Sequence, residues 1–179
     1  MPHLLLKSLP RYECILEAAQ RFPDLDPSAC EAFLHLLRAG DDVAHSRELY
    51  LARHNLSQGR FTVMMQLLDK GADRAISRTP AELADLTGVS RATMTGLIDT
   101  LERDGLVTRK PDPVDRRMMS VHLTPRGHQT LHEVLPGAFQ NMAAMLAPLT
   151  ESERKTLVRL LSKIMRTAKV AEPKIASVA

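Results

Sequence analysis

A run of small and hydroxyl-bearing residues with one arginine stands near the middle of the chain, Ser90-Arg91-Ala92-Thr93-Met94-Thr95-Gly96. Arginine can donate two hydrogen bonds to a guanine edge, serine and threonine hydroxyls bond phosphates or either type of base, and an apolar side chain suits the methyl group of thymine. The first amide groups of a helix also attract a phosphate. If the run opens a helix, it has the chemistry that reads the major groove of DNA. The alternative is an ordinary helix that these residues merely cap and solvate.

A stiff, basic segment follows closely, Lys-Pro-Asp-Pro-Val-Asp-Arg-Arg at residues 110–117. Its prolines restrict the backbone, so less entropy is lost when the segment enters a groove. Arginine is drawn to the negative potential of a narrow minor groove. Asp115 lies two residues before Arg117, where its carboxylate can orient the guanidinium. The residues predicted to contact DNA are Thr79, Ser90, Arg91, Thr93, Met94, Thr95, Lys110, Asp115, Arg116 and Arg117.

A short helix must precede the hydroxyl-rich run. Thr79-Pro80-Ala81-Glu82 combines an N-cap, a proline at the first helical position and a glutamate that can reach back to the cap amide. The pattern predicts that this helix turns Leu83, Ala84 and Leu86 inward and ends at Gly88.

The hydroxyl-rich run then opens a second helix, capped by Ser90 and ended by Gly105 in a left-handed conformation. Its predicted inward residues are Leu97, Ile98 and Leu101. Two helices joined by so tight a turn form a helix-turn-helix. Residues 106–109 and 118–123 are predicted as strands, the second with Met119, Val121 and Leu123 on one face, so that 110–117 is an exposed hairpin tip.

Longer helices are predicted before this region. Asp26-Pro27 begins a helix that continues to about Arg53, and Ser57 caps one that ends at Gly71.

Longer helices are predicted after it as well. Thr124-Pro125 begins a helix that Pro136-Gly137 should kink. Its inward residues are predicted to be Leu131, Leu135, Met142, Met145 and Leu146. Thr150 and Glu153 form a capping box for the last helix. The apolar stripe of that helix consists of Leu157, Leu160, Leu161 and Ile164.

These elements predict a mainly α fold with a small β-hairpin wing (α+β), a winged helix-turn-helix with long N- and C-terminal helices. The predicted division is 1–56 for N-terminal dimerisation helices, 57–127 for the DNA-binding domain, 128–171 for C-terminal dimerisation helices and 172–179 for a disordered tail. The outer helices carry apolar stripes that one short chain cannot easily cover. Pairing with a second copy is the simplest way to bury them, so we expect a homodimer.

The charge of the chain is a weak guide. The 179 residues carry a formal net charge of +3. From Thr79 to Gly127 there are seven basic and seven acidic residues, so DNA binding must depend on their arrangement. No segment has the pattern of a signal peptide or a membrane span, so we expect a cytoplasmic protein with no membrane partner. No metal or cofactor is expected.

The middle of the chain resembles the MarR family of regulators. The wing sequence Asp112-Pro113-Val114-Asp115-Arg116-Arg117 and the later Thr124-Pro125-Arg126-Gly127 are similar to that family's signature, as is Leu101-Glu102-Arg103-Asp104-Gly105-Leu106-Val107 upstream. The joint pattern covers about Thr79 to Gly127, and the flanking helices extend it over most of the chain. Residues 127–136 further resemble the branch of multidrug-efflux repressors.

The resemblance implies a triangular homodimer that presents two winged helices to a near-palindromic operator in double-stranded DNA, with repression as the default. It places Ser90, Arg91, Thr93 and Thr95 in the major groove, and Arg117, held by Asp115, in the minor groove. It also implies release by a small aromatic or phenolic effector bound between the dimerisation helices and the reading domain. Residues predicted there are Arg38, His45, Met64 and Met65.

Other functions were weighed against this one. The seven histidines are scattered, and His128 with His132 offers at most two zinc ligands, so the sequence does not favour an enzyme. Cys14 or Cys30 could sense oxidants if its thiolate were stabilised. A winged helix can also bind proteins instead of DNA.

Overall fold

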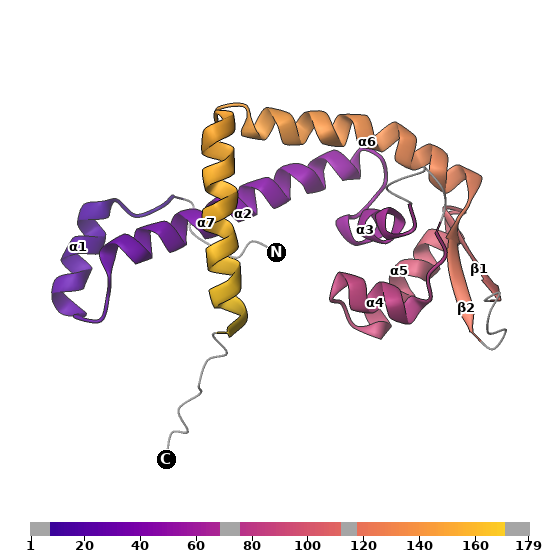
Figure 1. Cartoon of the computed structure of the whole chain (residues 1–179), viewed down its shortest axis with the longest axis horizontal. Coiled ribbons are helices and arrows are strands. Elements are labelled where there is room, and N and C mark those ends of the chain that lie inside the picture. The colour runs from indigo at the N-terminus through magenta and orange to yellow at the C-terminus, as the bar shows by residue number, and fades with distance from the viewer. Residues whose placement is uncertain (1–7, 69–75, 112–117, 171–179) are drawn as a thin grey trace, which may run out of the picture. The chain divides into compact units, whose positions relative to one another are not determined.

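The computed structural model describes residues 8–68, 76–111 and 118–170 (Figure 1). The chain divides into two compact units, Met1–Ala138 and Phe139–Ala179. Over the described residues, the elements are α1 (Tyr12–Arg21), α2 (Pro27–Ala52), α3 (Gln58–Gln66), α4 (Pro80–Thr87), α5 (Arg91–Arg103), β1 (Val107–Pro111), β2 (Met119–Leu123), α6 (Pro125–Leu146) and α7 (Glu151–Val170). The predicted class, mainly helical with one β-hairpin, is confirmed. The predicted tail, residues 172–179, lies outside the described residues.

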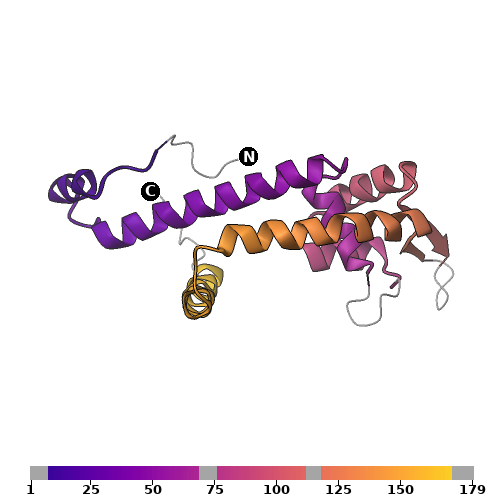
Figure 2. The same cartoon turned by 90° about the horizontal axis from the view of Figure 1, so that it is seen from above.

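Side-chain caps determine where the helices begin. Asp26 accepts hydrogen bonds from the amides of Ser28 and Ala29 at 2.9 and 3.1 Å. The bonds from the Ala29 amide and the Ser28 hydroxyl lower the pKa of Asp26, and α2 continues from this cap as one long rod (Figure 2). At α4, Oγ1 of Thr79 accepts from the Glu82 amide at 3.2 Å, and Oε2 of Glu82 accepts from the Thr79 amide at 2.7 Å. The predicted starts of both helices are confirmed.

Two glycines and one backbone hydrogen bond determine where α3, α4 and α5 end. Gly88 and Gly105 have φ values of 68° and 70°, the left-handed conformation that only glycine adopts at little cost. Both were predicted to end a helix, and the left-handed conformation was predicted for Gly105. The end of α3 was predicted wrongly at Gly71. The helix stops at Gln66 because the Leu67 carbonyl accepts a hydrogen bond from the Ile76 amide at 3.0 Å instead of continuing the helical pattern. Gly71 itself lies outside the described residues.

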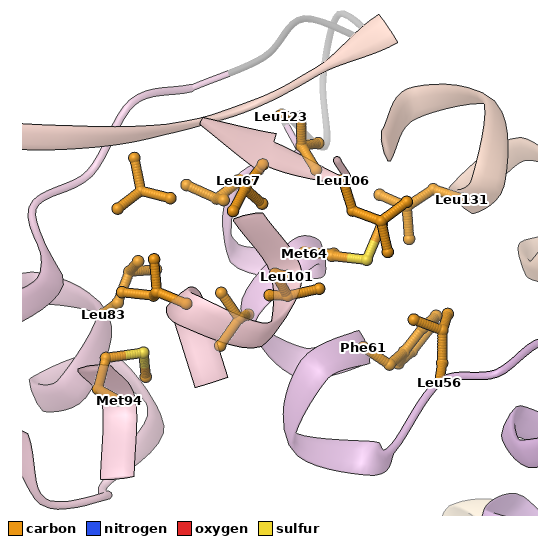
Figure 3. Close-up of a cluster of buried hydrophobic side chains, with 14 of the residues drawn as sticks. Leu56, Phe61, Met64, Leu67, Leu83, Met94, Leu101, Leu106, Leu123 and Leu131 are labelled. Atoms are coloured by element: carbon orange, nitrogen blue, oxygen red, sulfur yellow. The ribbon is translucent and has the colours of Figure 1, made fainter. Parts of the chain in front are cut away.

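The core of the first unit gathers side chains from α3, α4, α5, the hairpin and the start of α6 (Figure 3). Leu83 and Met94 lie beside each other in this cluster, with Met64 and Leu101 further along it (Figure 3). The fully buried side chains of α5 are Met94, Ile98 and Leu101, whereas Leu97 is only partly buried and packs against the core. A single hydrophobic cluster therefore holds the two short helices against the hairpin.

The prediction that Leu86 faces inward is wrong, because 52% of its surface is exposed. The buried face of the eight-residue α4 is centred on Leu83 and Ala84. The next residue on that face is Thr87, whose hydroxyl donates to the Leu83 carbonyl at 2.7 Å.

The hairpin pairs β1 with β2 in antiparallel register, with Val107 opposite Leu123 and Lys110 opposite Ser120. A third segment joins it, since Arg78 and Val121 exchange backbone hydrogen bonds at 2.8 and 3.3 Å. The period-two pattern of this strand is not matched by alternating burial at its first residues, because Met119 is 42% exposed while Ser120 is buried.

The turn into α6 is tightly packed. Oγ1 of Thr124 accepts from the Gly127 amide at 3.0 Å and donates to the Gly105 carbonyl at 2.7 Å. A Cβ atom on Gly127 would lie 2.1 Å from the Leu106 carbonyl oxygen, so no other residue fits there without a shift of the backbone. This turn fixes the start of α6 next to the end of α5.

The outer helices of the first unit also have defined contacts. The Tyr50 hydroxyl of α2 donates to the Val134 carbonyl of α6 at 2.7 Å, and a Cβ atom on Gly137 would lie 2.4 Å from that hydroxyl oxygen. Pro136 lies inside α6, which is one continuous helix in the structure. Helix α1, in the N-terminal extension, contacts α2 and buries Ile15.

The second unit contains the end of α6 and all of α7. Thr150 and Glu153 cap α7 as predicted: the Thr150 amide and hydroxyl donate to Oε2 of Glu153 at 2.7 and 2.8 Å. None of the α7 side chains that the structure describes is buried. Met142 and Leu146, predicted to face inward, are exposed within this single chain. Within the described ranges, no helix is both long and apolar enough to cross a membrane.

Candidate nucleic-acid interface

The first turn of α5 presents hydroxyl groups that are already ordered. Oγ of Ser90 accepts from the Thr93 amide at 3.1 Å, and the two hydroxyl oxygens lie 2.8 Å apart. The Thr95 hydroxyl donates to the Arg91 carbonyl at 3.0 Å. Ser90, Thr93 and Thr95 remain exposed, so the residues that cap this turn are also accessible to a ligand.

Arg91 is the cation of this turn. Its side chain is exposed, and its guanidinium group forms no hydrogen bond or ion pair with any other residue that the structure describes. It lines a cavity of about 340 Å³ together with Thr95 from the same helix, Thr79 at the start of α4, and Met118 and Met119 from the hairpin. Three segments that are distant in the sequence therefore form one surface around an available guanidinium.

Met118 and Met119 were missed as members of this surface. The period-two pattern groups Met119 with Val121 and Leu123 on one face, and it carries no signal for exposure at the end of the strand. An apolar wall beside Arg91 is consistent with contact to a thymine methyl group.

Met94 must be removed from the predicted DNA contacts. Its side chain is fully buried beside Leu83 and Ile98, so it cannot reach a base edge. Thr79 is also largely buried, and its hydroxyl is occupied by the capping box with Glu82. Its role is to fix the start of α4 next to the reading turn.

The two acidic residues of α5 share one arginine of the hairpin. The Arg109 guanidinium on β1 forms ion pairs with Asp99 and Glu102, and the Arg109 amide donates to Oε1 of Glu102 at 2.8 Å. Burial lowers the pKa of Arg109, but the hydrogen bonds and charges of these two carboxylates raise it above its ordinary value. These ion pairs also hold β1, the first strand of the wing, against α5.

A third ion pair lies at the C-terminal end of α5, where Arg60 of α3 binds Asp104. Asp99, Glu102 and Asp104, three of the seven acidic residues of this region, are therefore held in ion pairs. Arg91 on α5 and Lys110 on β1 are exposed. Asp115, Arg116 and Arg117, the predicted contacts of the wing tip, lie outside the described residues.

The residues predicted for an effector site occupy different surroundings. Arg38 pairs with Asp42 at 3.1 Å on α2, and His45 is exposed about two helical turns further along the same helix. Met64 is fully buried in the core, so the prediction that it lines a pocket is wrong. Met65 packs against that core and is partly buried.

The cysteines and histidines form no evident reactive centre within the described residues. Cys14 is exposed and Cys30 half-buried, and both are free thiols. No group of three or more potential metal ligands occurs in the ranges that the structure describes.

The helix-turn-helix, the clamped wing strand and the ordered polar turn define a winged helix-turn-helix protein of the kind that binds DNA. Comparison with known proteins agrees: the model of the MarR family matches residues 54–118. The chain is 36% identical to the transcriptional repressor YetL of Bacillus subtilis over 92% of its own length and 97% of the relative's. The chain belongs to the MarR family, whose members are transcriptional regulators rather than enzymes.

Two solved structures extend the comparison. BpsR of Bordetella bronchiseptica, whose DNA binding is regulated by 6-hydroxynicotinic acid, is 30% identical, with a TM-score of 0.62 over 73% of this chain and 91% of that one. MepR of Staphylococcus aureus, solved in complex with DNA, has a TM-score of 0.63 over 76% of this chain and 96% of that one. At 17% identity, the MepR comparison supports the winged-helix fold alone.

Proposed function

We propose that this regulator represses transcription by binding a near-palindromic operator as a homodimer, and that a small organic effector releases it. The observation that carries the proposal is the pairing pattern of α5. Its acids form ion pairs with Arg109 and Arg60, whereas the Arg91 guanidinium forms none with a described residue and lies among exposed hydroxyls at the opposite end. Such a helix presents a positive, hydrogen-bonding end to a major groove.

In this proposal Arg91 donates to a guanine edge, while Ser90, Thr93 and Thr95 contact phosphates or bases. Lys110 and the wing-tip residues Arg116 and Arg117 add contacts along the backbone and minor groove, with Asp115 orienting Arg117. These roles rest on residue type and exposure, and for the wing tip on the family resemblance.

The homodimer follows from the apolar surface of α7 and from the two-fold symmetry that operators of this class share with their proteins. Two recognition helices about 34 Å apart read two half-sites on one face of the duplex. Ligand that binds better to a dimer with another spacing shifts the population away from the DNA-bound form. The example of BpsR, regulated by 6-hydroxynicotinic acid, supports an aromatic acid as the effector class.

The test is a footprint on the chain's own upstream DNA, followed by titration of Arg91→Ala against operators with single-base changes. The variant should lose roughly 1–3 kcal/mol of binding free energy on the natural operator and should no longer discriminate at one base pair in each half-site. Arg159→Ala, an exposed arginine on α7, is the matched control. Unchanged affinity and specificity of the Arg91 variant would remove Arg91 from the reading surface.

A further inference from the structure

Two methionines lie where the wing tip meets β2: Met118, directly before the strand, and Met119, its first residue. Their side chains are 45% and 42% exposed, and Met118 directly follows Arg117, a predicted DNA contact. Both line the cavity of about 340 Å³ that is also lined by Arg91, and all of these residues belong to the first unit. This methionine pair therefore lies on the surface that, in the proposed function, faces DNA.

The fold fixes the position of the methionine pair from two sides. Since alternate side chains of a strand lie on opposite faces, Met119 shares a face of β2 with Val121, which is fully buried. The backbone of Val121 exchanges hydrogen bonds with Arg78 at 2.8 and 3.3 Å, which holds the start of α4 beside this strand. Val121 also lies opposite Arg109, which forms ion pairs with two carboxylates of α5. Met119 therefore continues the core-facing side of β2 beyond the edge of the core, to where α4 and α5 begin.

Most polar groups of the cavity lining are already occupied within the protein. The Thr79 hydroxyl donates to Oε2 of Glu82 at 3.0 Å, and the Thr95 hydroxyl donates to the Arg91 carbonyl at 3.0 Å. The Arg91 guanidinium, in contrast, forms no hydrogen bond or ion pair with a described residue. The remaining lining residues are apolar, namely Pro80, Ala81, Met118 and Met119. The cavity thus offers a ligand one cation beside an apolar wall.

Two groups of the major groove match this combination. Guanine presents N7 and O6 as acceptors, which suit a guanidinium, and thymine presents a C5-methyl group, which suits an apolar side chain. Consecutive base pairs are about 3.4 Å apart, so a methyl group within two base pairs of the guanine lies within about 7 Å of it along the duplex axis. Methionine suits such a contact, because its unbranched, flexible side chain and polarizable sulfur adapt to an irregular surface.

We propose that the methionine pair determines sequence specificity, by contacting the C5-methyl group of a thymine that lies within two base pairs of the guanine bound by Arg91. This inference rests on the proposed function, because it requires the first turn of α5 to lie in the major groove. It gives the start of β2 a base-reading role, whereas the wing residues Lys110, Arg116 and Arg117 contact the backbone and the minor groove in that function. Removal of the thymine methyl group should therefore cost affinity.

The test compares thymine with deoxyuridine, which lacks only the C5-methyl group. Each thymine of the footprinted operator is replaced in turn, and fluorescence anisotropy measures the affinity of the full chain for each duplex. Replacement of the contacted thymine should weaken binding roughly fourfold in each half-site, the effect expected when one methyl group is no longer removed from water. The Arg91→Ala titration on operators with single-base changes identifies the guanine, so the distance between the two bases is measured as well.

Two double variants assign the effect to the methionine pair. Met118→Gln/Met119→Gln keeps the length of the side chains but makes them polar, so it should bind the thymine and deoxyuridine duplexes equally. Met118→Leu/Met119→Leu is the matched control, because it keeps the wall apolar and should retain the difference. Each comparison uses one protein and two duplexes, so a folding defect lowers both affinities alike and leaves their ratio unchanged.

Four results would overturn the proposal while leaving the proposed function intact. In the first, the natural chain binds the operator specifically but does not distinguish any thymine from deoxyuridine. In the second and third, the glutamine variant retains the difference or the leucine variant loses it. In the fourth, the distinguished thymine lies more than two base pairs from the base that Arg91 reads. If the natural chain instead binds all duplexes alike, scrambled ones included, the proposed function is refuted and this inference with it.

Discussion

The winged helix of the first unit and helix α7 of the second unit use apolar residues in opposite ways. In the winged helix, Met94, Ile98 and Leu101 are fully buried and share one core with the hairpin. In α7, Leu157, Leu160 and Ile164 lie on one stripe and are 37%, 45% and 47% exposed. One region completes its core within a single chain, whereas the other has an apolar face that a single chain leaves uncovered. Such a face indicates a binding partner, and a second copy is the simplest one.

The largest effect is expected from placing charge on the α7 stripe. Leu157→Asp/Leu160→Asp should convert the dimer to monomers and weaken operator binding by more than roughly 100-fold, because the second half-site no longer adds to the first. Analytical ultracentrifugation measures the association, and fluorescence anisotropy measures the affinity.

Arg159→Asp is the matched control, because it introduces the same charge on the opposite face of α7. It should remain dimeric. A dimeric Leu157→Asp/Leu160→Asp variant with normal affinity would mean that α7 is not the dimer interface.

Next in size is the loss of packing in the winged helix. Met94→Ala should lower the free energy of unfolding by about 2–5 kcal/mol, because it opens a cavity in a complete core. Thr95→Ala, one residue along and exposed, should change stability by less than about 0.5 kcal/mol. Urea denaturation of both variants measures the two stabilities and so distinguishes the buried face of α5 from its exposed face. Equal stability of the two would contradict the burial of Met94.

A smaller effect is expected from the clamp between the wing and the recognition helix. Arg109→Gln should cost about 1–2 kcal/mol of stability, because it removes two partly solvated ion pairs. It should also weaken DNA binding, since β1 is then held less firmly to α5. Chemical denaturation and operator titration measure the two effects, with the solvent-exposed Arg103→Gln as the stability control. A variant that binds and unfolds like the natural chain would show that the clamp is dispensable.

The smallest effect is a pH dependence at the start of α7. Hydrogen bonds from the Thr150 amide and hydroxyl lower the pKa of Glu153 below its ordinary value. The folded form therefore gains stability above the unfolded-state pKa and loses it as the pH falls through the lower folded-state pKa. Far-UV circular dichroism during acid titration should register partial loss of α7, and Glu153→Gln should lack this component. A Gln variant with the same titration curve would contradict the role of the carboxylate.

Local signals predicted much of this fold. Asp26, Thr79, Ser90 and Thr150 were predicted as caps because the residue type at a helix start has a direct hydrogen-bonding consequence. Gly88 and Gly105 were predicted as helix ends, Gly105 because a left-handed conformation costs glycine little.

The errors arose at residues whose burial depends on packing between elements. Leu86 is apolar yet exposed, because the centre of a buried face depends on neighbours that are distant in the sequence. Met94 was predicted to contact DNA because it lies near the start of α5, but its side chain is the one in this segment that points into the core. The ion pairs of Arg109 with Asp99 and Glu102 join β1 to α5. Because they depend on the fold, a count of charges along the sequence does not reveal which of the charged residues are paired.

The central claim is that two copies of this chain bind one DNA duplex through the exposed turn of α5. The most direct measurement is a fluorescence-anisotropy titration of the full chain against duplexes from its own upstream region at two salt concentrations, with a scrambled duplex as control. The account predicts tight binding of one dimer per operator, a steep loss of affinity with added salt from counterion release, and no comparable binding to the scrambled duplex. Weak binding that is independent of both sequence and salt would contradict it.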